Sequence, residues 1–146
     1  MSTKIILCTC GDTLNDNIDY SALTDYARNL VGVNEVEPMK ALCTAGDRKK
    51  LVNKIKNHDR LVFLACTRSV CGNPIEAAMQ EANLHKDKYV LVNAKEQIAS
   101  VHSNRTDATQ KAKMLLNAAV AKVTLAEPLE IMTYQRAQEA LVVGGG

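Results

Sequence analysis

The chain has 146 residues, the length of one ordinary domain, and 47% of them are hydrophobic, which is enough to fill a buried core. Only 3% are aromatic and Trp is absent, so a platform of aromatic side chains for stacking nucleotide bases is not expected. The 18 basic and 16 acidic side chains leave a net charge of +2, which indicates no nucleic acid and no membrane as a main partner.

The first third of the chain predicts two strands, each followed by a helix. An apolar run at 4–7 indicates a strand, and apolar residues at helical spacing over 23–30 indicate the helix after it. The extended segment 33–39 contains Pro38, which has no N–H for a central ladder, so we expect it at the edge of a sheet. Asp47 then caps a predicted helix that has an apolar stripe on one side and a basic, solvated face.

The rest of the chain continues the alternation of strands and helices. The segment 60–65 is uniformly apolar after its first residue, which is typical of a central parallel strand buried on both faces. An Asn-Pro pair at 73–74 predicts the start of a helix, and a short strand follows at 89–92. A long amphipathic helix is predicted from Thr106 to the residues before Pro128.

This order predicts an α/β protein with three layers: a mostly parallel four-stranded sheet with helices on both faces, a Rossmann-like arrangement. We expect one domain over 1–128, a linker over 129–139 and, over 140–146, a further strand that enters a glycine-rich turn. The strand and turn are typical of the start of a dinucleotide-binding fingerprint, and a flexible glycine tail is the alternative. The glycines of this incomplete fingerprint are Gly144, Gly145 and Gly146.

The cysteines are the component most informative about function. They are Cys8, Cys10, Cys43, Cys66 and Cys71. No apolar leader opens the chain and no run of eighteen apolar residues occurs, so we expect a cytoplasmic protein whose thiols stay reduced. Every cysteine lies at or just past the carboxyl end of a predicted strand, where parallel sheets place their ligand sites. This placement favours a shared metal or redox site over five isolated buried thiols.

The residues alone leave the chemistry of that site open. Four thiolates suit zinc or an iron–sulfur cluster, but the spacing matches neither a zinc ribbon nor a compact ferredoxin motif. A nucleophilic thiol is the alternative, because Cys71 comes just before the helix predicted at 73–74 and a helix N-terminus lowers a thiol pKa. The segment 61–79 is similar to the phosphate loop of low-molecular-weight tyrosine phosphatases, but Gly72 and Ala77 occupy the positions where the arginine would be needed, and no Asp-Pro pair is present.

A resemblance to one family extends over nearly the whole chain. The segments that carry it are Cys-Thr-Cys-Gly at 8–11, Cys43, Ala-Cys-Thr at 65–67, Asn-Ala-Lys-Glu-Gln at 93–97, Val-His-Ser at 101–103, and the shorter matches at 108–109, 111–112, 121–122 and 127–129. As an ordered set they resemble the N-terminal iron–sulfur domain of the A subunit of heterodisulfide reductase. That subunit is the flavoprotein of cytosolic electron-transfer complexes in methanogens and related anaerobes.

The resemblance implies a cluster-binding domain at 1–128 that carries one [4Fe–4S] cluster, with Cys8, Cys10, Cys43 and Cys66 as its ligands. Cys71 stands where the family often has histidine, so it is a substitute ligand, a neighbour of the cluster or a spare thiol. Ile98 departs too, since many relatives have cysteine there. The resemblance also implies that 140–146 is the first strand and turn of a truncated FAD domain, with FAD bound only by the full-length parent chain.

On this resemblance the domain breaks no substrate bond by itself and passes single electrons between FAD and other clusters of the complex. Its partners are the FAD domain of the same parent chain, the other heterodisulfide reductase subunits, and a hydrogenase or similar electron donor. We expect glycine turns at Gly11, Gly46 and Gly72 to direct N–H groups at the cluster sulfurs. The alternative from another class is a non-catalytic zinc-binding or scaffold module, with a thiol-based redox or sulfur-transfer role less favoured.

Overall fold

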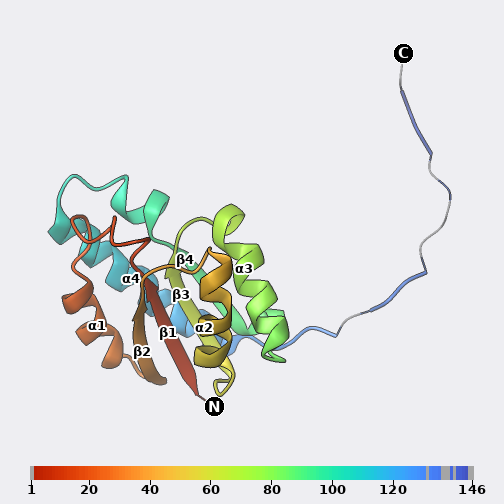
Figure 1. The fold of residues 1–146 in the computed structure, drawn as a ribbon, viewed down its shortest axis with the longest axis horizontal. Coiled ribbons are helices and arrows are strands. Elements are labelled where there is room, and N and C mark those ends of the chain that lie inside the picture. The colour runs from red at the N-terminus through yellow and green to blue at the C-terminus, as the bar shows by residue number, and fades with distance from the viewer. Residues whose placement is uncertain (1, 131, 136–138, 140, 145–146) are drawn as a thin grey trace.

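The computed structural model describes residues 2–130, 132–135, 139 and 141–144, and its centre is a parallel sheet (Figure 1). The strands of the sheet are β1 (Thr3–Cys8), β2 (Val33–Met39), β3 (Arg60–Ala65) and β4 (Tyr89–Asn93). They lie in the order β2-β1-β3-β4, and each neighbouring pair is parallel. The predicted α/β fold class and four-stranded sheet are confirmed, and β2 with Pro38 lies at an edge as expected.

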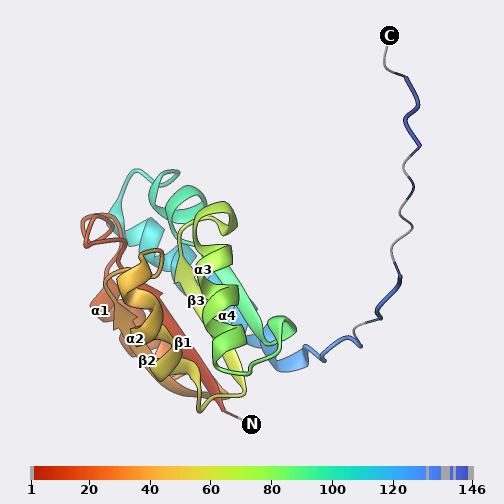
Figure 2. The same ribbon diagram turned by 45° about the vertical axis from the view of Figure 1, so that its right-hand side comes forward.

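Helices cover both faces of this sheet. They are α1 (Tyr20–Arg28), α2 (Ala45–Ile55), α3 (Arg68–Glu81) and α4 (Arg105–Leu125), with a 3₁₀ turn at Lys86–Lys88 and a π turn at Lys95–Ala99. The helices α1 and α4 contact each other on one face, and α2 and α3 contact each other on the opposite face (Figures 1 and 2). The Asp19 carboxylate accepts from the N–H of Ala22 and so caps α1, and the Asn104 side chain accepts from the N–H of Asp107 at the start of α4.

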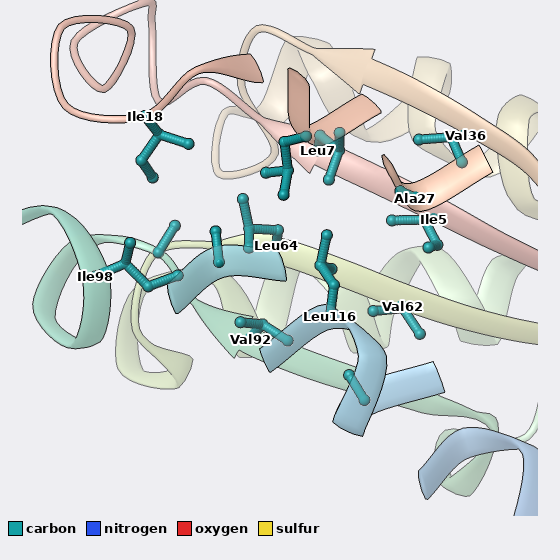
Figure 3. Close-up of a cluster of buried hydrophobic side chains, with 14 of the residues drawn as sticks. Ile5, Leu7, Ile18, Ala27, Val36, Val62, Leu64, Val92, Ile98 and Leu116 are labelled. Atoms are coloured by element: carbon teal, nitrogen blue, oxygen red, sulfur yellow. The ribbon is translucent and has the colours of Figure 1, made fainter. Parts of the chain in front are cut away.

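The core is divided by the sheet into two apolar layers, because successive side chains of a strand point to opposite faces. In β1, Ile5 and Leu7 pack toward α1 and α4, whereas Ile6 and Cys8 pack toward α2 and α3. Figure 3 shows the first layer, in which Leu116 of α4 lies against side chains of the strands. The core forms with few aromatic residues because most of the buried side chains are aliphatic or Ala.

Two predicted helix starts are wrong. Helix α3 begins at Arg68, with Thr67 at the N-cap, so the Asn-Pro pair at 73–74 lies inside the helix. Pro74 has no N–H to donate to the Val70 carbonyl, so the helix lacks this one hydrogen bond near its exposed start. Helix α2 begins at Ala45 after Thr44, and the expected cap Asp47 lies in its first turn.

The segment after α4 has no regular secondary structure in the described residues 126–130, 132–135, 139 and 141–144. Leu141, Val142 and Val143 are exposed and have no regular secondary structure. The domain boundaries and the strand expected over 140–146 stay predictions, since a strand of a following domain would need strands of that domain with which to pair. Gly144 has a φ of +84°, and Gly145 and Gly146 lie outside the described residues. None of the helices formed by the described residues is both long enough and apolar enough to cross a bilayer.

The packing of α4 predicts that shortening a side chain of this helix lowers stability by an amount that depends on how deeply the side chain is buried. Leu116 is fully buried, so Leu116→Ala should lower the free energy of unfolding by about 2–5 kcal/mol, because it leaves a cavity in the α1/α4 layer. Met114 is exposed on the same helix, so Met114→Ala should change stability by less than about 0.5 kcal/mol. Urea denaturation followed by circular dichroism measures both, and similar effects for the two variants would contradict this packing.

Candidate functional site

The site lies at the carboxyl ends of β1 and β3, the two central strands. The chain moves from β1 to β2 on one side and later places β3 on the other side of β1, so these strand ends are the topological switch point of the sheet. Leu7 pairs with Leu64, so Cys8 ends β1 level with the end of β3, and Cys66 follows directly. Ligands of parallel α/β sheets gather at such a point.

A strained turn after β1 carries Cys10 toward β3. Cys10, Gly11 and Asp12 have φ values of +53°, +68° and +70°, a left-handed run that costs energy at the two positions that are not glycine. The Thr9 hydroxyl donates to Asp12 Oδ1 at 2.8 Å, and the Gly11 N–H donates to the Lys40 carbonyl at 2.7 Å. These contacts hold the turn against the loop that follows β2.

The turn brings two thiols into direct contact. The Sγ atoms of Cys10 and Cys66 are 3.3 Å apart, although the two residues are separated by 56 positions in the chain. Cys66 is buried, and Cys10 is partly exposed and packs against both core layers. Cys8 Sγ lies 3.9 Å from the Lys40 carbonyl on the α2/α3 side of the sheet.

Cys71 is placed differently from the expectation. It is the fourth residue of α3, fully buried, and its N–H donates to the Thr67 carbonyl at 3.0 Å. It therefore does not precede a helix N-terminus, as the prediction of a start at 73–74 required. Its side chain lies in the same core layer as Cys8 and Cys66.

The pKa values of the buried thiols argue against a nucleophile. Burial raises the pKa of Cys8 to about 11 and that of Cys66 to about 12, and it also raises the pKa of Cys71. A hydrogen bond with Cys10 adds to the rise at Cys66, and the charges of the neighbouring cysteines oppose ionisation of all three. These thiols keep their protons at neutral pH, which is the opposite of an activated cysteine.

Cys43 is the one predicted ligand that the structure leaves exposed. It lies in the loop between β2 and α2, next to the buried Leu42, and its charge affects the pKa values of Cys8 and Cys71. In the described part of the chain no three metal-binding side chains are already arranged as a closed site. The donors fit an iron–sulfur cluster or zinc by their chemistry, because all are soft sulfur ligands, and closure around either requires the Cys43 loop or the Cys10 turn to move.

Tyr20 is a residue of this site that sequence reasoning missed. Its hydroxyl donates to the Cys8 carbonyl at 2.8 Å, and burial, together with the charges of Cys8, Cys10 and Cys66, raises its pKa. A tyrosine that opens a helix gives no sequence signal of such a role. Its side chain is partly buried and packs against the α1/α4 core layer.

Two of the expected glycine turns are wrong. Gly46 lies in the first turn of α2 and Gly72 lies inside α3, where a Cβ would meet the Arg68 Cγ at 3.0 Å. Gly11 alone of the three is in a turn, with a positive φ. Ile98, where the resemblance expects cysteine in many relatives, is buried in the α1/α4 layer, on the side of the sheet opposite to Cys8 (Figure 3).

Fold and site together define a doubly wound α/β domain with a group of cysteines at its switch point. Over 97% of its length the chain is 31% identical to the A subunit of ferredoxin:CoB-CoM heterodisulfide reductase of Methanosarcina acetivorans. It is 32% identical to the A subunit of H(2):CoB-CoM heterodisulfide,ferredoxin reductase of Methanothermobacter thermautotrophicus, and 29% identical to an iron-sulfur A subunit of CoB–CoM heterodisulfide reductase of Methanopyrus kandleri. The resemblance is confirmed: the chain is a homologue of a domain of the A subunit of heterodisulfide reductase.

This homology covers a limited part of the relatives. The chain spans about a fifth of the length of these curated relatives, 18% of the first and 22% of the other two. It matches no protein-family profile.

The raised thiol pKa values predict a loss of stability at alkaline pH. In the folded chain Cys8 keeps its proton up to about pH 11, whereas in the unfolded chain it loses the proton near its ordinary pKa of 9.0. Between these values the unfolded state binds fewer protons, so the free energy of unfolding of the reduced, metal-free chain should fall as pH rises.

Urea denaturation at a series of pH values measures this fall. It should be smaller in Cys8→Ala than in the parent, and Met114→Ala, which removes no titrating group, is the control. The comparison between variants is needed because Tyr20 and Tyr89 also have raised pKa values. Equal slopes for Cys8→Ala and the parent would contradict the burial of this thiol.

Proposed function

We propose that this chain is an electron-transfer domain that holds one [4Fe–4S] cluster through Cys8, Cys10, Cys43 and Cys66. The observation that supports a shared thiolate site most is the convergence of Cys10 and Cys66, from distant parts of the chain, beside the buried Cys8 at the switch point. The printed name of the Methanopyrus kandleri relative describes an iron-sulfur subunit, which favours a cluster over other uses of these thiols. When bound, such a cluster accepts and donates single electrons.

The residues around the thiols have three tasks under this proposal. The turn at Cys10 orients its sulfur, since hydrogen bonds from Thr9 and Gly11 fix the backbone on both sides. Tyr20 and the apolar layer around Cys8 exclude water, which tunes the reduction potential of a bound cluster. Cys43 lies in an exposed loop, so it would have to approach the other thiols to complete the ligand set.

The protonation states of the thiols would change on binding a metal. Cys8, Cys66 and Cys71 resist ionisation because their charges would be buried together. Metal ions deprotonate coordinating thiols outright, so cluster assembly would convert this repulsion into attraction. Cys71 then serves as a buried neighbour of the cluster or as a substitute ligand.

The proposal extends to the assembly. Electrons pass between this cluster and FAD in a following domain of the parent chain, whose first strand and turn are 140–146 with Gly144, Gly145 and Gly146. Other clusters of a heterodisulfide reductase complex complete the route, and the electron donor is a hydrogenase or a similar protein of the cytoplasm. The domain by itself catalyses no bond chemistry. Two of the relatives are named for both ferredoxin and the CoB-CoM heterodisulfide, which supports a place in such a route.

One observation favours zinc as the second candidate. Two thiolates on one tetrahedral zinc, each with a bond of about 2.3 Å, lie roughly 3.8 Å apart, and the 3.3 Å between Cys10 and Cys66 is close to that separation. In a [4Fe–4S] cluster each cysteine binds a different iron, so its sulfurs lie further apart. A zinc-binding or scaffold role is therefore the alternative function.

Single Cys→Ser variants of all five cysteines test the ligand set. After anaerobic reconstitution with iron and sulfide, the Cys8, Cys10, Cys43 and Cys66 variants should each lose most of the bound iron, because serine is a poor ligand for the cluster. Cys71→Ser should retain it and is the matched control, since Cys71 is as buried as Cys8. Iron and acid-labile sulfide per chain are the measurements.

The outcomes of this series separate the alternatives. Retention in Cys43→Ser with loss in Cys71→Ser would replace Cys43 by Cys71 in the ligand set. One zinc per chain, no iron, and loss of zinc in the Cys10 and Cys66 variants would support the zinc alternative and reject the cluster.

A further inference from the structure

The contact between Cys10 and Cys66 has a second chemical capacity, independent of any metal. We propose that in the cluster-free chain these two thiols form a disulfide when they meet a small-molecule disulfide. A disulfide bond is about 2.05 Å long, so the sulfurs, which are 3.3 Å apart, need to approach by only about 1.3 Å. The strand ends are held by the sheet, and the partly exposed side chain of Cys10 supplies the movement.

The environment of the thiols selects this pair over the others. Cys8 and Cys10 are two positions apart, a spacing too tight for an easy disulfide. Cys43 is exposed on another loop and makes no sulfur contact within the described residues. Cys71 is the competitor, since its thiol interacts with Cys66, but it is fully buried inside α3 and out of reach of a reagent in solution. Cys10 is the accessible member, and Cys66 is the thiol that it touches.

The reaction balances with a disulfide such as oxidised glutathione as the oxidant. The Cys10 sulfur attacks one glutathione sulfur, which breaks the S–S bond and releases the first glutathione thiol. The Cys66 thiol then loses its proton and attacks the Cys10 sulfur of this mixed disulfide, which releases the second glutathione; the free Cys10 thiol that helped to raise the pKa of Cys66 is no longer present at this stage. Two electrons and two protons pass from the protein thiols to the reagent, so one disulfide is formed as one is reduced.

The consequence for the site depends on the proposed function. With Cys10 and Cys66 joined, two of the four proposed ligands are blocked, so the oxidised chain cannot assemble a cluster until a dithiol reduces it. The pair would act as a redox gate on cluster assembly. This step rests on the cluster proposal, whereas formation of the disulfide does not.

Peptide mapping identifies the bond. Under oxygen-free conditions the reduced, metal-free chain is incubated with oxidised glutathione, alkylated and digested with trypsin without reduction. Cleavage after Lys4, Arg28, Lys40, Arg48, Arg60, Arg68 and Lys86 separates Cys43 (41–48), Cys66 (61–68) and Cys71 (69–86). Only Cys8 and Cys10 share a peptide (5–28), and matched variants resolve them.

The expected product is peptide 5–28 linked to peptide 61–68, with a loss of two titratable thiols per chain. The link should persist in Cys8→Ser and Cys71→Ser and disappear in Cys10→Ser. A dominant link from 61–68 to 69–86, a link that survives Cys10→Ser, or glutathione mixed disulfides alone would each overturn the proposal.

A second measurement separates this proposal from the proposed function. The oxidised chain is offered iron and sulfide before and after reduction by dithiothreitol, and uptake should occur only after reduction. If the 5–28/61–68 link forms but the reduced chain takes up no iron, the disulfide proposal is supported and the cluster proposal is rejected. If the reduced chain takes up iron but no such link forms, the cluster proposal is supported and the disulfide proposal is rejected.

Discussion

Parallel pairing of β1 with β3 is the constraint on which the rest of the structure depends. Leu7 pairs with Leu64, so residues more than fifty positions apart end their strands side by side. β2 lies on the other side of β1, so the chain leaves β1 toward β2 and not toward β3. The carboxyl ends of β1 and β3 are therefore open to a turn and are not covered by a direct connection between these two strands. The contact of Cys10 with Cys66 is a direct result of this pairing.

The energetics of the site follow from where its sulfur atoms are buried. Cys8, Cys66 and Cys71 occupy the α2/α3 core layer, where protonated thiols pack as small apolar groups and thiolates are opposed by burial and by one another. The strained turn at Cys10 costs stability locally and is held by contacts with Asp12 and Lys40. Both features are compatible with a site that is completed by a cationic group, since a metal ion would deprotonate these thiols.

Sequence periodicity predicted the sheet well because its signals are local. The apolar run at 60–65, the edge position of Pro38 and the alternation of elements all follow from side-chain pattern and hydrogen-bond capacity. The starts of α2 and α3 cannot be read from the sequence in this way: Thr44 and Thr67 occupy the N-caps without a side-chain cap, and an Asn-Pro pair is typical of a first turn although Pro74 lies inside α3. Tyr20 could not be found from the sequence, because its contact with the Cys8 carbonyl depends on the shape of the turn between them. The strand expected at 140–146 stays a prediction, because its pairing partners would belong to a following domain.

Electron paramagnetic resonance of the anaerobically isolated chain would show whether thiols gathered by the β1/β3 pairing hold an iron–sulfur cluster. After reduction with dithionite we expect one unpaired electron spin per chain, together with about four iron and four sulfide. A colourless chain that contains one zinc, no iron and no paramagnetic signal would contradict it.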